Sequence, residues 1–400
     1  MEIKLETLSP VHIGTGNSYG KAEFITEDNE LRRIIFSRLY DSLSEEQREE
    51  LLSELEEKEF NLDEVVRKNK IRVSEDMILY RALMKSSPSR EIREQIKTNN
   101  IPYIPGSSIK GSIRTAFLWK FICEDYDNLK DKINSCIYKT LRSNLPLEKK
   151  KKNICNEFIS KVFQLNDRKY DAKYDLLKFL HVSDFMPNEE DASKIIEIEK
   201  IVGYSLKRDN KFENWAMIKT RRGNRKVSLI NYLEIVKKGI EFNGSISLNP
   251  QIKSALENNQ EHPLLKDKLE ILGLDEGNLE EEKMLTHIKN TLREFNNWAI
   301  DKEIELCRKA SNGRNFCEVL RGIDTGNSIR VGFGVGTTYQ TLIKLIEEKD
   351  VNLAQRIVNA LRLGKFSRNI KGNKLIPPYP KSIEFTQQDE PLGWMRFEQG

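Results

Sequence analysis

The sequence predicts an α+β protein built from two related halves. In residues 1–8, apolar and charged side chains alternate, which predicts a half-buried strand. Residues 263–308 instead carry apolar side chains at helical spacing, which predicts helices between the strands. A weak internal echo, HIGTGNS at 12–18 and GIDTGNS at 322–328, fits a chain of two related halves.

Composition narrows the class of protein. Hydrophobic residues make up 38% of the 400 residues and charged residues 32%, which is typical of a helix-rich protein or one whose polar faces a partner covers. The net charge is only +4, but the charges are unevenly placed. The opening MEIKLETLSPVHIG lacks a basic start and an apolar stretch, and no window has the roughly 18 apolar residues of a membrane helix. We therefore expect a cytoplasmic protein without a leader and without membrane contact.

The amino-terminal region contains two strand candidates and a helical insertion. The segment PVHIGTGNSYG follows the first strand, and its proline and glycines are expected to break regular structure before a second strand at about 21–26. Residues 38–98 then turn helical and acidic, with ten acids and two bases between 44 and 65. This pattern predicts an insertion with a solvated acidic face, which a phosphate-binding surface would avoid.

Residues 101–119, IPYIPGSSIKGSIRTAFLW, predict an extended entry, a turn and a helix. Apolar residues follow the turn at helical spacing, and the opposite face carries Lys110 and Arg114 with no acid between residues 105 and 120. The free N–H groups and the positive dipole at the start of this helix are suited to bind a phosphate group. The alternative is a basic face that only water contacts. The turn and helix cap are expected at Gly106, Ser107 and Ser108.

The middle of the chain carries a second helical insertion and a basic turn. Residues 120–177 are helical and lysine-rich, and strands are expected at 179–185, 215–220 and 241–248. Between the last two lies KTRRGNRK, with five cations in eight residues. This is either a mobile surface hairpin or an RNA contact that mostly sets salt dependence. Its candidate residues are Arg221, Arg222 and Arg225.

The carboxyl-terminal part contains a glycine-rich loop, RVGFGVGTTYQ. We expect strands at 315–323 and 328–331, the loop, a helix at 338–361 and an extended closing segment. A dinucleotide fingerprint would need its third glycine at position 337, which is Thr337, and GNSYGKA at 16–22 fails as a Walker loop, so small nucleotides are not predicted. The loop either lets phosphates approach its peptide groups or packs as a tight strand-to-helix corner. Its candidate contacts are Arg330, Gly332, Gly334, Gly336, Thr337 and Tyr339.

Catalytic and metal sites have little support in the sequence. The five cysteines show no CxxC spacing, which predicts free thiols rather than a disulfide framework or a zinc knuckle. The four histidines have no metal-ligand spacing, so we expect no metal and no cofactor. His12 lies beside a glycine turn, where it is either a general acid/base or a packed, hydrogen-bonded side chain.

Five short motifs resemble the RAMP superfamily of CRISPR proteins. They are SPVHIGTG, YIPGSSIKGSIRTAF, VSDF, the glycine loop RVGFGVGTTYQT, and the closing IPPYPKSIEF with PLGWMRF. The last pair is similar to the large RAMP subunit of type III-A (Csm) effector complexes. The resemblance implies two ferredoxin-like (RNA-recognition-motif-type) domains at 1–250 and 251–400, with helical insertions at about 38–98 and 120–177.

The resemblance also implies a function. It implies a non-catalytic subunit that binds single-stranded crRNA, caps its 3′ end beside the backbone RAMP subunits, and assists maturation of the crRNA. Small helical subunits and host ribonucleases are further expected partners. The alternative is a metal-independent endoribonuclease that processes CRISPR repeats. Carried over by motif, the expected RNA contacts are His12, Gly14 and Gly16, then Gly106, Ser107, Ser108, Lys110, Gly111 and Arg114, and the loop glycines Gly332, Gly334 and Gly336.

Overall fold

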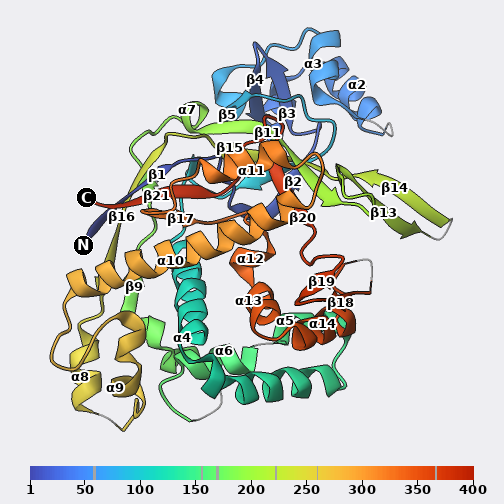
Figure 1. Cartoon of the computed structure of the whole chain (residues 1–400). Helices are drawn as coiled ribbons and strands as arrows, with labels where there is room; N and C mark the ends of the chain where they lie inside the picture. The colour runs from blue at the N-terminus through green and yellow to red at the C-terminus, as the bar shows by residue number, and fades with distance from the viewer. Residues whose placement is uncertain (57–59, 155, 168–170, 221–222, 259, 365–366) are drawn as a thin grey trace.

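The structure is a computed structural model, and its strands and helices confirm the predicted α+β class (Figure 1). It describes all of the chain except residues 57–59, 155, 168–170, 221–222, 259 and 365–366. Within the described residues no helix is long and apolar enough to cross a membrane.

The first large sheet joins the two ends of the chain. Its strand order is β10–β16–β1–β21–β17, with β9 also paired to β16. The first and last of these strands in sequence run antiparallel, with Ile3 opposite Gln399, so the termini lie side by side (Figure 1). Alternate side chains of β1, including Ile3 and Leu5, are buried as predicted. The strands are β1 (Glu2–Thr7), β9 (Leu180–Val182), β10 (Met186–Pro187), β16 (Glu241–Leu248), β17 (Ser328–Arg330) and β21 (Trp394–Gln399).

The second large sheet has the order β2–β6–β15–β11–β5–β4–β3, with β12 and β20 also paired to β11. Parallel pairings join β11 to β5 and β15 to β6, while the other neighbours run antiparallel. Each large sheet thus contains strands from both sides of residue 250, and a domain boundary there stays a prediction. The strands are β2 (Gly14–Tyr19), β3 (Phe24–Glu27), β4 (Glu30–Ile34), β5 (Ile78–Met84), β6 (Ile92–Gln95), β11 (Ile196–Leu206), β12 (Phe212–Glu213), β15 (Ile230–Val236) and β20 (Ser382–Thr386).

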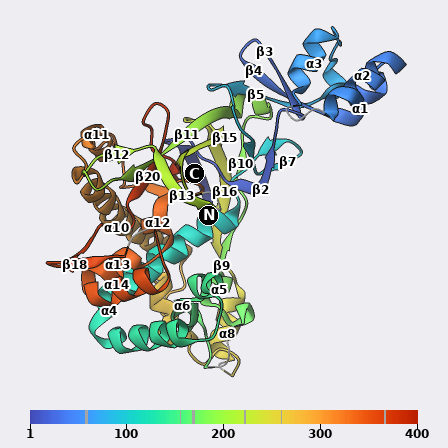
Figure 2. The same cartoon turned by 90° about the vertical axis from the view of Figure 1, so that its right-hand side faces the viewer.

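Two long helices, α4 (Gly106–Arg142) and α10 (Glu281–Arg308), cover the first sheet and contact each other and β17 (Figures 1 and 2). The predicted apolar stripe of α4 is buried, with Ile109 and Ile113 fully covered. Farther along α4, Trp119 packs against Phe295 of α10 with ring centroids 5.7 Å apart. Each large apolar side chain buried in this way stabilises the fold by roughly 1.5–3 kcal/mol.

The acidic insertion is helical only in its first half. Helices α1 (Phe36–Ser42), α2 (Glu45–Leu55) and α3 (Leu62–Lys68) pack around their own small core, which includes Leu39 and Leu51. Residues 78–84 and 92–95 form β5 and β6 rather than helix, because Tyr80, Ala82 and other side chains there face the sheet core. The prediction of helix up to about residue 98 is therefore wrong.

Two further predictions of secondary structure are wrong. Residues 315–323 do not form a strand but lie largely in helix α11 (Arg314–Arg321), whose apolar side chains Phe316, Cys317 and Leu320 share one face at helical spacing. The single helix expected at 338–361 is instead three, and the last begins where the Asp350 side chain accepts the Leu353 N–H at 2.9 Å. These helices are α12 (Gly336–Gln340), α13 (Ile343–Lys349) and α14 (Val351–Ala360).

The internal echo is not a structural repeat. HIGTGNS at 12–18 contributes most of β2, which also contradicts the expected break in regular structure, whereas GIDTGNS at 322–328 lies in the loop that leads into β17. The predicted basic hairpin is present as β13 (Trp215–Thr220) paired with β14 (Gly223–Ser228), and it projects from the molecule (Figure 1).

The remaining described elements are short. The strand pairs β7 (Lys97–Thr98) with β8 (Ile101–Pro102) and β18 (Asn369–Lys371) with β19 (Lys374–Ile376) form small hairpins. The helices are α5 (Leu147–Asn153), α6 (Asn156–Phe163), η1 (Glu75–Met77), η2 (Ala172–Tyr174), η3 (Leu176–Phe179), α7 (Ala192–Ile195), α8 (Gln251–Glu257), α9 (Leu265–Lys268) and η4 (Leu269–Leu272).

Candidate nucleic-acid interface

The start of α4 is built by close backbone packing. Helix α4 begins at Gly106, where a Cβ atom would lie 2.3 Å from the carbonyl oxygen of Val182, so glycine is required. The Gly106 N–H donates to the Asp184 carboxylate at 2.8 Å. The sequence placed a serine cap here, and that expectation is wrong: Pro105 is the cap residue, and Ser107 and Ser108 lie in the first turn. Because Asp184 already holds a negative charge at this helix end, the helix dipole is not free for a phosphate.

The exposed face of the same turn is open. Ser107 and Gly111 are exposed, and a Cβ atom at Gly111 would meet nothing within 4 Å. Glycine in an exposed helix interior costs about 1 kcal/mol relative to alanine, so neither packing nor helix propensity accounts for it. Close approach of another molecule's backbone does account for it. Among the described residues, no acid lies within ion-pair distance of the neighbouring Lys110, and burial lowers the pKa of this lysine.

The Arg114 side chain makes its contacts inside the protein rather than at this open face. Its guanidinium donates to both carboxylate oxygens of Asp175, at 3.1 and 2.8 Å, and lies 4.2 Å from the Phe163 ring centroid. Asp175 also caps η3 by accepting the Leu177 N–H at 2.9 Å. Arg114 therefore ties the second helical insertion to α4, and its role as an RNA contact stays a prediction.

The glycine loop is a tightly packed corner on one side. Gly332 and Gly334 have φ angles of +88° and +77°. A Cβ atom at Gly332 would lie 2.2 Å from the His12 carbonyl oxygen, and one at Gly334 would lie 2.4 Å from Leu392. The corner interpretation of these two glycines is therefore correct for the inner face of the loop. The outer face is only half-buried, and Gly336 at its end is exposed.

The Arg330 and Tyr339 side chains pack together in the core beneath the loop, so neither is placed to touch RNA. The Arg330 guanidinium donates to Glu303 of α10 at 2.8 Å and to the Leu392 carbonyl at 2.9 Å. It lies 4.6 Å from the Tyr339 ring centroid, and all three charged or phenolic side chains are buried. Burial acts to lower the Arg330 pKa, but attraction to Glu303 outweighs it and raises this pKa, so the guanidinium stays charged.

The amino-terminal glycine segment meets the same loop. The Phe333 N–H donates to the His12 carbonyl at 2.7 Å, and the rings of these two residues are 6.0 Å apart, edge to face. Gly14 and Gly16 lie in β2, the outer strand of the second sheet, and are exposed, and a Cβ atom at Gly16 would meet nothing within 4 Å. The structure thus brings together two predicted glycine motifs that are over 300 residues apart in sequence.

Arg93 is a candidate contact that sequence reasoning missed. It is exposed on β6, next to β2, and its guanidinium lies 5.1 Å from the Phe333 ring centroid. An arginine and an aromatic ring beside an open glycine strand are typical of single-stranded RNA sites. Its segment, EIREQIK, lies in the region predicted as a helical insertion, and its apolar residues Ile92 and Ile96 are four apart, so the sequence gives no signal of a strand.

His12 is a packed histidine, as one of the two open interpretations held. Its ring Nδ1 lies 2.6 Å from the Glu234 carbonyl oxygen, and burial lowers its pKa. The neighbouring Glu234 carboxylate accepts hydrogen bonds from Tyr19 and Tyr80, both at 2.7 Å, and Lys97 also donates to it. A tyrosine, lysine and histidine set would suit metal-independent RNA cleavage, but each of these side chains contacts Glu234, and His12, Tyr19 and Tyr80 are buried in the core.

The other candidates are less informative. Arg225 is exposed on β14, consistent with either interpretation of the hairpin, while Arg221 and Arg222 lie outside the described residues. In the part of the chain that is described, no group of three or more His, Cys, Asp or Glu side chains is arranged to hold a metal ion.

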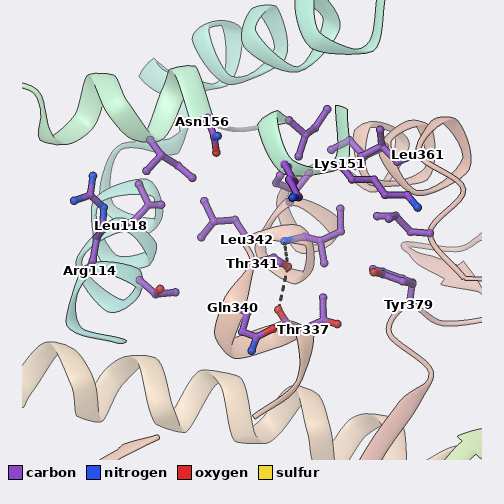
Figure 3. A pocket seen from close by; sticks show the side chains of 18 residues that line it. Arg114, Leu118, Lys151, Asn156, Thr337, Gln340, Thr341, Leu342, Leu361 and Tyr379 are labelled. Carbon is purple, nitrogen blue, oxygen red and sulfur yellow. Dashed lines mark hydrogen bonds between the residues drawn. The ribbon is translucent and has the colours of Figure 1, made fainter. Parts of the chain in front are cut away.

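A cavity of about 430 Å³ lies beside α4 and the helices that follow the glycine loop (Figure 3). Half of its lining residues are aliphatic, such as Leu118 and Leu342. Arg114, Lys151 and Thr337 also line it, and the side chain of Tyr379 points into it from the closing segment. Its lining residues come from α4 itself and from helices that follow the glycine loop, among them α12, which contacts α4.

Comparisons with known proteins agree with the resemblance. The RAMP superfamily model matches residues 4–337. The chain is 22% identical to the CRISPR system Cms protein Csm5 of Methanocaldococcus jannaschii, over 99% of this chain and 88% of that protein. It is similar to a chain in a cryo-EM structure of a Csm–crRNA–target RNA ternary complex from a type III-A CRISPR-Cas system, with a TM-score of 0.68, 22% identity, and coverage of 99% and 100% of the two chains. It is also similar to the crystal structure of T. onnurineus Csm5, with a TM-score of 0.59, 20% identity, and coverage of 98% and 99%.

Proposed function

Because this chain belongs to the RAMP superfamily, we propose that it is the crRNA-binding large RAMP subunit of a type III-A Csm effector complex. The relatives that support this role are a Csm5 protein aligned over nearly the whole chain and a chain within a Csm–crRNA–target RNA complex. In this role the subunit grips the guide RNA without cutting it, caps the 3′ end, and assists crRNA maturation.

The observation that carries the proposal is the open glycine on α4. Gly111 stands exposed in a helix interior, beside Lys110, with space for a sugar–phosphate backbone to lie against the helix. Gly336 and Thr337 lie in α12, which contacts α4, and the Ser112 hydroxyl donates to the Arg330 carbonyl at 3.2 Å just before the glycine loop. We infer that the RNA runs over α4 and along the outer face of this loop toward Gly16 and Arg93.

The proposed partners follow from this role. The backbone RAMP subunits of the Csm complex are the direct neighbours on the guide RNA, and small helical subunits and host ribonucleases are further candidates. Helices α1–α3 have their own core, and the acidic helix α2 repels phosphate, so we expect them to face away from the RNA.

Charge reversal on α4 tests the proposal. Lys110→Glu removes about one phosphate contact, which lowers the salt slope of RNA binding by about 0.7 and weakens binding at least about fourfold at physiological salt. Gly111→Leu should weaken binding similarly because its side chain fills the open space. The matched control is Lys130→Glu, the same charge change farther along the same helix, which should bind like the wild type.

The readouts are fluorescence anisotropy with a labelled single-stranded RNA over a salt series, and retention of the subunit in the purified complex. Wild-type chain incubated with repeat RNA in EDTA should leave the RNA intact on a gel. If the wild-type chain binds no RNA, either alone or in its complex, the proposal is refuted. Cleaved repeat RNA would restore the endoribonuclease alternative.

A further inference from the structure

The cavity of about 430 Å³ beside α4 borders the surface that we propose for the guide RNA (Figure 3). Thr115 of α4 lines this cavity, and the Thr115 hydroxyl donates to the Gly111 carbonyl at 3.0 Å, one helical turn back toward the open face. Thr337 of α12 lines it as well, directly after the exposed Gly336. An RNA strand that lies against Gly111 and Gly336 therefore passes beside the cavity.

The lining residues of this cavity are of two kinds. Among the described residues, every exposed lining residue is polar, for example Asn156, Gln340 and Thr341. Every buried lining residue is aliphatic, so the cavity has a polar rim at the surface and an apolar floor. A site with this distribution accepts a group that has apolar faces and a polar edge. The buried residues of the floor are Leu118, Leu342, Ile343, Ile346, Ile357 and Leu361.

Tyr379 gives the cavity an aromatic surface. Its side chain is half-buried and points into the cavity from the closing segment (Figure 3). The Arg368 guanidinium lies 5.4 Å from the Tyr379 ring centroid, and this cation–π contact helps to hold the ring in place. Aromatic rings stack on bases of any identity, and such contacts are typical of proteins that bind single-stranded RNA.

Charge does not identify the ligand of this cavity. Arg114 pairs with Asp175 at 2.8 Å, and Lys151 pairs with Glu148 at 2.8 Å, so both of these lining cations have acidic partners. What the cavity offers to a ligand is apolar surface with hydrogen-bonding groups at the rim. This combination matches a flat ring better than a phosphate group.

We propose that this cavity is a base-binding site, which takes one base of the guide RNA as that base turns away from its neighbours. The inference rests on the proposed function, because that function places the RNA backbone along Gly111 and Gly336. The base lies between the aliphatic floor and Tyr379, and its edge faces Gln340 and Asn156 at the rim. A base is favoured over an apolar protein side chain because its edge carries hydrogen-bond donors and acceptors that match these two amides.

The test combines Gln340→Trp in the full chain with single-stranded RNA from which one base at a time is removed, while the ribose and the phosphate stay. In the wild type, removal of the base that enters the cavity should weaken binding about fivefold or more. In Gln340→Trp the indole closes the cavity, so intact RNA should bind about as weakly, and that position should become insensitive to base removal. The salt slope should stay at the wild-type value, because no phosphate contact is lost.

The matched control is Gln251→Trp, the same change at an exposed glutamine that begins α8 and does not line the cavity (Figure 1). This variant should bind every RNA like the wild type. The Tm of each variant checks folding.

If every position keeps its wild-type sensitivity to base removal in Gln340→Trp, the inference is overturned, while RNA binding by the wild type leaves the proposed function standing. If the wild-type protein binds no RNA at all, the proposed function fails first. A lower salt slope in Gln340→Trp would mean that phosphate contacts were lost, which would contradict a base site. If Gln340→Trp loses a protein partner from the complex with unchanged RNA affinity, the cavity takes a protein segment, and its assignment to a base is wrong.

Discussion

The buried pair of Arg330 and Glu303 gives the sharpest prediction about the glycine loop. Arg330→Met would leave the Glu303 carboxylate buried without its partner at 2.8 Å, and would remove the donor to the Leu392 carbonyl. Removing one member of a buried ion pair costs about 3–5 kcal/mol. For 400 residues that unfold as one unit, this corresponds to a fall in Tm of about 4–6 °C.

The assay is thermal unfolding together with RNA binding below the transition. The double variant Arg330→Met with Glu303→Leu should recover most of the lost stability, because the orphaned charge is gone. The control is Arg314→Met, whose pair with Glu318 is exposed and screened by water, so the Tm should stay close to that of the wild type. If Arg330→Met keeps the wild-type Tm but loses RNA affinity, Arg330 is an RNA ligand, and its interpretation as a buried side chain that stabilises the glycine loop is wrong.

Three further predictions follow from the same contacts. Gly106→Ala should cost more than about 2 kcal/mol because its Cβ meets the Val182 carbonyl, whereas Gly111→Ala should raise helix stability by about 1 kcal/mol; equal effects in urea unfolding would contradict the packing. Asp175→Ala should destabilise the chain by about 2–4 kcal/mol, since Arg114 and the Leu177 N–H lose their acceptor, and an unchanged Tm would contradict this. Burial lowers the folded-state pKa of His12, so the neutral side chain contributes its full stability above about pH 6.5, and this contribution falls as the pH drops through the folded-state pKa. In urea unfolding from pH 7.5 to 5, the free energy of unfolding should therefore depend less on pH in His12→Asn than in the wild type. Identical pH profiles of the two proteins would refute this prediction.

Much of the site could be predicted because its elements are local. The apolar stripe of α4 is periodic, and the glycines of the loop mark a sharp corner in any context. The positions of Gly111 and Lys110 on the outer face follow from that period alone. These elements needed no long-range information.

The errors have long-range causes. Arg330 looks like a surface cation in sequence, and its partner Glu303 lies 27 residues earlier, on helix α10. Asp184, which takes the place of the expected serine cap, is 78 residues from Gly106. Arg93 was missed because its strand is short and highly charged, and only its pairing with β2 and β15 makes it part of a sheet.

Ultraviolet crosslinking of the purified complex, with mass spectrometry of the RNA-modified peptides, tests most directly whether the open face of α4 grips the guide RNA. We expect an RNA-modified peptide that contains Lys110 and Gly111. Crosslinks confined to other surfaces, such as helices α1–α3, with none on the first turns of α4, would contradict the account.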